Sequence, residues 1–175
     1  QEVPKPDYAR NMRIIGHSDQ GGRADGVQVM VSGGYAYVGH VFSGGFSILD
    51  VRDPRDPKFV RHISQPAGTW SQHLQTYGDL LLVNNMKDML QDSTLKAGEY
   101  YSGSIGEKVD LSGGGRDYSS GIRFYDISDR ANPREIGFLD VPGLGIHRMW
   151  YDGGRWVYFS ALPPGFSDDI RLRPG

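Results

Sequence analysis

The sequence contains no cysteine. Disulfide bridges, thiolate metal sites and cysteine nucleophiles are therefore excluded. Long apolar runs are also missing, so we expect no membrane-spanning segment. The 19 Lys and Arg residues nearly balance the 21 Asp and Glu residues, which gives a formal net charge of −2. A nucleic-acid-binding surface usually carries an excess of basic residues, so we expect no nucleic-acid partner.

Glycine and proline are abundant, with 25 and 10 residues among 175. This composition is typical of many tight turns between short strands. The first residue is Gln1 rather than methionine. A mature exported protein and a piece of a longer polypeptide both fit this start. The compartment, periplasmic or exported against cytoplasmic, therefore stays open.

Two internal repeats dominate the sequence. The segment GGFSILDVRDPRDP at residues 44–57 returns as SGIRFYDISDRANP at residues 120–133. A second piece occurs three times, with Gln28, His73 and His147 at equivalent positions, each followed by a glycine-containing turn and an apolar run. Self-similarity of this kind indicates a repeat architecture.

The first copy predicts four short antiparallel strands, at residues 26–31, 35–40, 45–51 and 58–63. Four such strands joined by Gly, Asp and Pro turns are typical of one blade of a β-propeller. We therefore predict an all-β fold, a single partial β-propeller over residues 1–175. Blade 1 covers about 26–64, blade 2 about 71–140, and a partial blade 3 about 145–175.

The second and third copies depart from the first. Blade 2 carries an insertion at residues 86–119, rich in Gly, Ser, Asp and Tyr. This insertion is either a functional flap or a surface decoration. The third copy has only its first hairpin, including a strand at residues 157–161. About two and a half blades are present, whereas a propeller closes with four to eight. We therefore expect a further polypeptide segment or subunit to complete the ring, because an unpaired strand edge promotes aggregation.

The run Tyr35-Ala36-Tyr37-Val38, followed by residues 45–51 and repeated at 121–127, resembles the LVIVD repeat of bacterial and archaeal proteins. Residues 11–22 and 69–76 are similar to one uncharacterised subfamily of these proteins. The resemblance implies a propeller fold and says little about function. It also implies that the third blade would continue beyond residue 170, where Arg171 to Gly175 depart from the pattern.

The candidate site follows from the predicted fold. The first strand of each blade lies nearest the propeller axis, so His73 and His147 should converge there with Gln28. His40 and Asn85 end the second strands, beside the starts of the first strands in an antiparallel hairpin. All five side chains should therefore gather around one mouth of the channel.

Neutral imidazoles that converge in this way suit a divalent transition metal such as zinc, iron or copper. The predicted metal ligands are His73, His147, His40 and His17. Neighbouring polar residues that could orient the ligands or face a substrate are Gln28, Asp19, Asp25, Asn85 and Arg148. The alternative is that these groups only line a water-filled tunnel, since no short His-x-x-x-His pattern is present.

Two functions remain in view. The first is a metal-binding propeller, including a metal-dependent enzyme that acts on a small molecule at the channel mouth. The second is a non-catalytic scaffold that binds a protein or saccharide partner. No nucleotide cofactor is expected, because Gly113-Gly114-Gly115-Arg116 lacks the strand-to-helix context of a phosphate-binding loop.

Three other residue types have simpler roles. The aspartates that follow the third strand, Asp50 and Asp126, are expected to cap turns by bonding backbone N–H groups. His62 is expected to be a solvated surface residue. The tryptophans, Trp70, Trp150 and Trp156, are expected to pack between blades.

Overall fold

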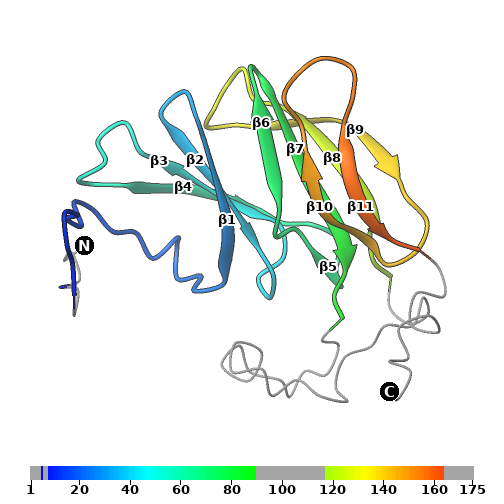
Figure 1. Ribbon diagram of the computed structural model, residues 1–175, viewed down its shortest axis with the longest axis horizontal. Helices are drawn as coiled ribbons and strands as arrows, with labels where there is room; N and C mark the ends of the chain where they lie inside the picture. The colour runs from blue at the N-terminus through cyan, green and yellow to red at the C-terminus, as the bar shows by residue number, and fades with distance from the viewer. Residues whose placement is uncertain (1–4, 6–7, 90–116, 164–175) are drawn as a thin grey trace.

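The computed structural model describes residue 5, residues 8–89 and residues 117–163 (Figure 1). These residues form an all-β structure of antiparallel sheets. No helix in this part of the chain is long and apolar enough to span a membrane. The strands are β1 (Gly26–Ser32), β2 (Tyr35–His40), β3 (Phe46–Asp50), β4 (Lys58–Ile63), β5 (Thr69–Trp70), β6 (Leu74–Tyr77), β7 (Leu80–Lys87), β8 (Gly121–Asp126), β9 (Arg134–Asp140), β10 (Gly145–Trp150) and β11 (Tyr158–Leu162).

The first repeat folds into a four-stranded sheet with the order β1-β2-β3-β4. Each of the four predicted strands is present, with ends that differ by at most one residue. The β1–β2 turn uses Gly33 and Gly34 at φ values of 55° and 78°. Positive φ at two consecutive residues is what a tight hairpin turn needs, and glycine adopts it without steric cost.

The second repeat pairs its strands in the same sequence, β6 with β7, β7 with β8, and β8 with β9. The register is also the same, because Tyr35 lies opposite Asp50 in the first copy and Leu80 lies opposite Asp126 in the second. Both copies carry a register irregularity at the equivalent point, after Ile48 and after Phe124. The repeat seen in the sequence is therefore a repeat of backbone geometry.

The predicted insertion separates β7 from β8, which nevertheless pair directly. Strand β7 continues to Lys87, and β8 begins at Gly121. Residues 90–116, which make up most of the predicted insertion, lie outside the described residues, and so do the final residues of the predicted blade 3.

The third repeat supplies the hairpin β10–β11, joined to β7 through the pair Gly145–Met86. Strand β11 starts one residue later than predicted. Trp150 pairs with Tyr158, whereas its counterparts Val31 and Thr76 pair with the residues equivalent to Trp156. The longer loop shifts this hairpin by two residues relative to the other two.

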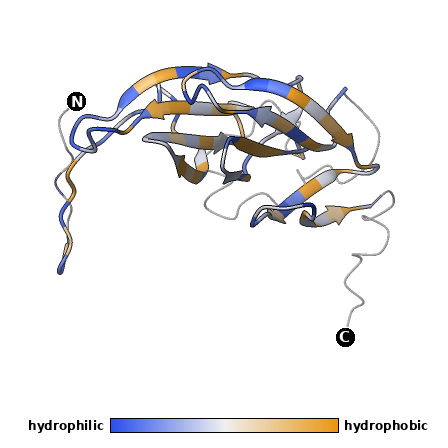
Figure 2. Ribbon diagram, turned by 90° about the horizontal axis from the view of Figure 1, so that it is seen from above, coloured by the Kyte–Doolittle hydropathy of each residue, from blue (hydrophilic) through white to orange (hydrophobic). Residues whose placement is uncertain are grey.

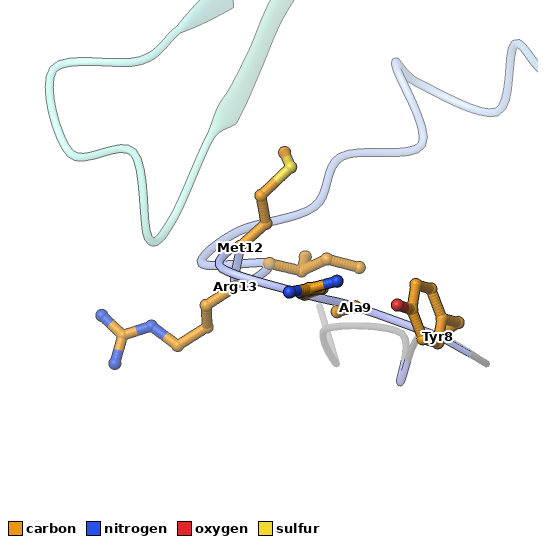
Figure 3. Close-up of a pocket in the computed structure, with 6 residues that line it drawn as sticks. Tyr8, Ala9, Met12 and Arg13 are labelled. Atoms are coloured by element: carbon orange, nitrogen blue, oxygen red, sulfur yellow. The ribbon is translucent and has the colours of Figure 1, made fainter.

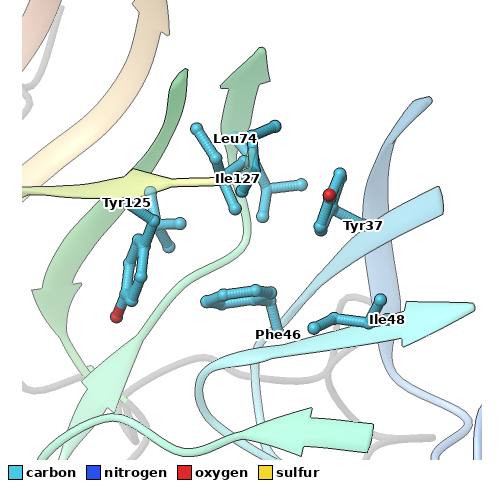
Figure 4. Packing of buried hydrophobic residues seen from close by; sticks show 8 residues of the cluster. Tyr37, Phe46, Ile48, Leu74, Tyr125 and Ile127 are labelled. Carbon is cyan, nitrogen blue, oxygen red and sulfur yellow. The ribbon is translucent and has the colours of Figure 1, made fainter. Parts of the chain in front are cut away.

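The main core lies between the two four-stranded units. Phe46, Ile48 and Tyr37 face Leu74 and Tyr125 in Figure 4, and all five are at most 3% exposed. The Phe46 and Tyr125 rings meet edge-to-face at 5.2 Å between centroids. Full burial of side chains of this size contributes about 1.5–3 kcal/mol each, which makes this cluster the main hydrophobic connection between the units.

The opposite face of the second unit packs against the third repeat. Leu82 and Ile122 from β7 and β8 contact Ile146 and Met149 from β10. The hairpin β10–β11 lies at one end of the second sheet, whose strand order is β11-β10-β7-β8-β9. Figure 2 shows apolar and polar stretches side by side along the strands. Successive repeats therefore stack face to face.

The acidic turn residues have the predicted role. Asp50 accepts a hydrogen bond from the backbone N–H of Arg52 at 3.1 Å, and Asp126 accepts the equivalent bond from Ser128 at 2.9 Å. The Arg52 side chain, together with this backbone bond, lowers the pKa of Asp50 to about 2. The bond from Ser128, together with Arg134, lowers the pKa of Asp126 to about 2. The same Asx turn thus ends the third strand of both copies.

The prediction for tryptophan is correct for one residue of three. Trp70 is 2% exposed and packs with Val41 and Met86. Trp150 and Trp156 are 63% and 64% exposed on the β10–β11 hairpin, so the prediction for them is wrong. Their faces lack a covering strand within the described part of the chain.

Candidate functional site

Three of the predicted site residues come together at the first strands of the three repeats. Figure 1 shows β6 between β1 and β10. The His73 and His147 ring centroids are 5.6 Å apart, with ring planes at 79°. The Gln28 side-chain oxygen lies 3.2 Å from His73 Nδ1 and accepts a hydrogen bond from the Leu74 backbone N–H at 2.8 Å. Equivalent positions of consecutive repeats therefore meet, as the sequence predicted.

Asn84 holds the two histidine-bearing segments together, and the sequence analysis missed it. Its side-chain oxygen accepts a hydrogen bond from the His73 backbone N–H at 2.8 Å. Its side-chain nitrogen donates to the carbonyl oxygen of Ile146, the residue before His147, at 2.6 Å. The side chain is fully buried. Asn84 thus sets the spacing of the two imidazoles from the strand between them.

Both imidazoles are held in the neutral form. Burial lowers the pKa of His73 to about 4, and the charge of Arg148 and the His147 ring contribute further. Burial and Arg148 also lower the pKa of His147. Desolvation disfavours the charged imidazolium, and so does a nearby cation. Each ring therefore keeps a nitrogen lone pair at neutral pH.

His40 lies elsewhere, although it was predicted to join this group. Its backbone is opposite Gly26 rather than Gln28. Its ring is fully buried, with Nδ1 at 3.0 Å from Asp25 Oδ1 and Nε2 at 2.8 Å from Ser47 Oγ. Asp25 is likewise engaged, since it also accepts bonds from the Ser43 backbone N–H and hydroxyl.

His62 belongs to this second cluster, which contradicts its predicted solvated position. Its Nδ1 lies 3.3 Å from Ser47 Oγ, and its ring meets the His40 ring at 5.5 Å between centroids. Burial, with Arg23 and His40, lowers the pKa of His62 to about 4. Burial alone would raise the pKa of Asp25, but bonds from His40 and Ser43 hold it well below its usual range. We call Asp25, His40, Ser47 and His62 the first-repeat polar network.

The first-repeat polar network has the order of contacts of an Asp-His-Ser triad. Ser47, however, is fully buried, and both neighbours of its hydroxyl are histidine rings. A nucleophile must be reached by its substrate. The arrangement therefore acts here as a buried hydrogen-bonding connection between β2, β3, β4 and the segment before β1.

Asn85 is directed away from the histidine pair. Its side-chain nitrogen donates to Ser71 Oγ at 3.2 Å and to Gln65 Oε1 at 3.4 Å. The residue that faces His73 is instead its neighbour Asn84. Consecutive strand residues point to opposite sides, so an offset of one residue is enough to exchange them.

His17 and Asp19 lie in the N-terminal segment. His17 is exposed beside a polar hollow of about 350 Å³ formed by residues 17–24. The Asp19 carboxylate accepts a hydrogen bond from the Gly21 backbone N–H at 3.0 Å, and the Asp19 carbonyl oxygen accepts one from the Gly22 N–H at 2.9 Å. These contacts of Asp19 lie within the N-terminal segment.

The N-terminal segment also forms a larger hollow of about 430 Å³, lined by residues 8–14. Figure 3 shows Tyr8, Met12 and Arg13 pointing in different directions from one extended segment. Tyr8 and Met12 are 80% and 83% exposed. This hollow has no converging polar groups of the kind that fix a ligand.

Within the described residues, no group of three or more His, Asp or Glu side chains is arranged to hold a metal ion. The histidine pair could therefore supply two protein ligands of an ion. Structural sites take four ligands, whereas open sites combine protein side chains with water or substrate.

The described residues define an all-β protein of antiparallel sheets, one of four strands and one of seven. Residues 21–64, which contain β1 to β4, match the LVIVD repeat. The first unit is therefore an LVIVD repeat, as its sequence indicated. No curated protein matches the chain.

Proposed function

We propose that the chain is an arc of a β-propeller. Strands β1–β4 and β6–β9 form two blades, and β10–β11 is the first hairpin of a third. The common strand order, register and bulge of the two complete units support this arrangement. So does the contact of first strands across units, through Gln28 to Leu74 and Asn84 to Ile146. LVIVD repeats typically build propellers, in which first strands surround the axis.

We propose that His73 and His147 bind a divalent transition metal at this axis. The observation that carries the proposal is the meeting of two neutral imidazoles from consecutive repeats. Two imidazoles bound to one ion through zinc–nitrogen bonds of about 2.0–2.1 Å have ring centroids roughly 5–6 Å apart. The observed separation is 5.6 Å. Neutral rings are also the form that ligates a metal.

The ion would retain open positions for water or for an oxygen-containing small molecule. A bound metal acidifies its water and polarises such a ligand, which is the chemistry a metal-dependent enzyme would use. Arg148 adds positive charge beside both rings, as its effect on their pKa values indicates. An anionic group on the small molecule would be favoured by that charge.

Calorimetric titration with Zn²⁺, joined to metal analysis of the purified chain, tests the metal proposal. We expect one ion per chain and at least a tenfold loss of affinity in the double variant His73→Ala, His147→Ala. His17→Ala is the matched control, because His17 is exposed and lies in the segment before β1. Unchanged zinc binding in the double variant would refute the site. Absence of zinc binding in the wild type would favour the scaffold alternative.

We further propose that another polypeptide strand pairs with the free edge of β11. In the first two units, the equivalent edges of β2 and β7 are covered by β3 and β8. Within the described residues β11 pairs only with β10. Tyr158 on it is 64% exposed, whereas the equivalent hairpin strands are largely buried. Light scattering tests this: a monodisperse, cooperatively unfolding monomer of residues 1–175 would contradict it.

A further inference from the structure

The end of the Gln28 side chain that touches His73 can be identified chemically. The same atom accepts a hydrogen bond from the Leu74 backbone N–H at 2.8 Å. An amide N–H can only donate, so this atom must be the amide oxygen. The other end, Nε2, lies 3.9 Å from the sulfur of Met30, a weak acceptor. The orientation of the Gln28 amide is therefore fixed by its neighbours.

This orientation determines the proton position on His73. Nδ1 of His73 lies 3.2 Å from the Gln28 oxygen, which has lone pairs and no proton. A hydrogen bond between them requires Nδ1 to carry the proton. A neutral imidazole has one ring N–H, so Nε2 keeps its lone pair. Free histidine prefers the opposite tautomer, with the proton on Nε2.

We infer that Gln28 fixes His73 in the Nδ1–H tautomer, so that Nε2 is the nitrogen that meets the ligand of this site. Gln28 is a positioning residue: it acts on the ligand through His73. Histidine ligands of metals commonly donate their second ring N–H to a carbonyl or carboxylate, which fixes the tautomer and the ring orientation. The Gln28 amide oxygen supplies this acceptor from the preceding repeat.

The pair of contacts also explains why the two repeats must be in place together. Gln28 belongs to β1, whereas its partners are Leu74, the first residue of β6, and His73, the residue before it. Gln28 in the first repeat thus determines which ring nitrogen of His73, in the second repeat, is free to bind a ligand.

Long-range ¹H–¹⁵N correlation spectra of the histidine rings at pH 7.5 test the inference. In the wild type, His73 should show a protonated Nδ1 and an unprotonated Nε2. Gln28→Leu removes the acceptor and should shift the main population to the Nε2–H tautomer. Gln28→Glu keeps an oxygen acceptor for both N–H groups and should retain the Nδ1–H tautomer. Gln75→Leu, in β6 but without a contact to His73, is the control and should leave the spectrum unchanged.

Addition of Zn²⁺ then tests the proposed metal site separately from the tautomer. The inference rests on the proposed function only for the identity of the ligand that binds Nε2. The expected result is a shift of the His73 Nε2 signal with Nδ1 still protonated. A wild-type ring that carries its proton on Nε2, or a Gln28→Leu spectrum identical to that of the wild type, would overturn the role of Gln28. A wild-type Nδ1–H tautomer that does not respond to Zn²⁺ would instead overturn the metal site alone.

Discussion

Replacement of Asn84 by alanine should destabilise the chain and separate the histidine pair. Asn84 is fully buried and makes two hydrogen bonds to backbone groups, at 2.8 Å to the His73 N–H and 2.6 Å to the Ile146 oxygen. Alanine leaves both of these partners without a bond. A buried polar group left unsatisfied costs about 1–3 kcal/mol, so we expect a loss of roughly 2–4 kcal/mol in the free energy of unfolding.

Asn85→Ala is the matched control, one residue further along the same strand. Its side-chain nitrogen makes longer contacts, at 3.2 Å and 3.4 Å, and both partners are side chains. Its side-chain oxygen has no hydrogen-bond partner among the described residues. Since less is lost, we expect a cost of about 1 kcal/mol or less. The two variants remove the same atoms from the same strand.

Urea unfolding, followed by tryptophan fluorescence, measures the free energy of unfolding of both variants. The two values can be compared if the m-values are equal. Amide hydrogen exchange adds the local effect, and protection should fall at residues 73–75 and 145–147 in Asn84→Ala only. If Asn84→Ala costs no more than Asn85→Ala, the assignment of Asn84 as the connection between the histidine-bearing segments is wrong.

Three further predictions follow from other contacts. Because His62 and His73 have pKa values of about 4 in the folded chain and about 6.5 when unfolded, the unfolded state binds more protons and stability falls as the pH drops below about 6.5. From pH 7 to pH 5 the free energy of unfolding falls by at most about 2 kcal/mol per ring, or by roughly 1 kcal/mol once solvent screening of these half-buried rings is taken into account. Urea midpoints at the two pH values measure it, and His62→Gln should reduce the difference. Asp25→Asn weakens three hydrogen bonds to a buried carboxylate and should cost about 2–4 kcal/mol, whereas a loss below 1 kcal/mol would contradict its buried role. Gly145→Ala should lower the melting temperature by several degrees, since φ is 108° and a Cβ atom would lie 2.4 Å from the backbone carbonyl oxygen of Asn85. An unchanged melting temperature would contradict the close packing of β7 against β10 at this residue.

Much of the strand arrangement could be predicted because the repeat contains both the strands and their turns. Paired glycines fix the first hairpin, and an aspartate fixes the turn after each third strand. The pairing of Leu80 with Asp126 then follows from that of Tyr35 with Asp50. The third hairpin departs from this rule because its loop is longer, and a loop of that kind shows in the sequence only as extra polar residues.

The histidine pair could be predicted from repeat position alone, but its supporting residue could not. Asn84 and Asn85 are the same residue type, and the alignment of the repeats cannot say which faces His73. Strand residues alternate in direction, so that choice depends on the phase of β7. The second partner of Asn84 is the backbone carbonyl oxygen of Ile146 in β10. A backbone partner cannot be inferred from the pattern of side chains in the sequence.

The wrong placement of His40 has a related cause. A histidine at a strand end resembles a ligand in the sequence, but its partners, Asp25 and Ser47, come from a loop and from another strand. A ring nitrogen that donates its proton to a carboxylate has no lone pair to offer a metal ion, so the contact with Asp25 removes Nδ1 of His40 as a ligand. The sequence shows the histidine but not which acceptor its ring bonds in the folded chain.

The two complete units share a backbone but not their buried polar groups, and this difference gives each unit a distinct neighbour. In the first unit Ser47 lies opposite His62, and in the second the equivalent pair is Arg123 and Phe138, stacked at 4.6 Å. The position equivalent to Asp25 in the second unit is occupied by Trp70, so the second unit has no carboxylate there to pair with a buried imidazole. Leaving buried polar groups without partners is costly, so His40 and Ser47 could not be transferred to the second unit without Asp25. The buried polar groups are therefore specific to each unit, although the two units share the strand order and register.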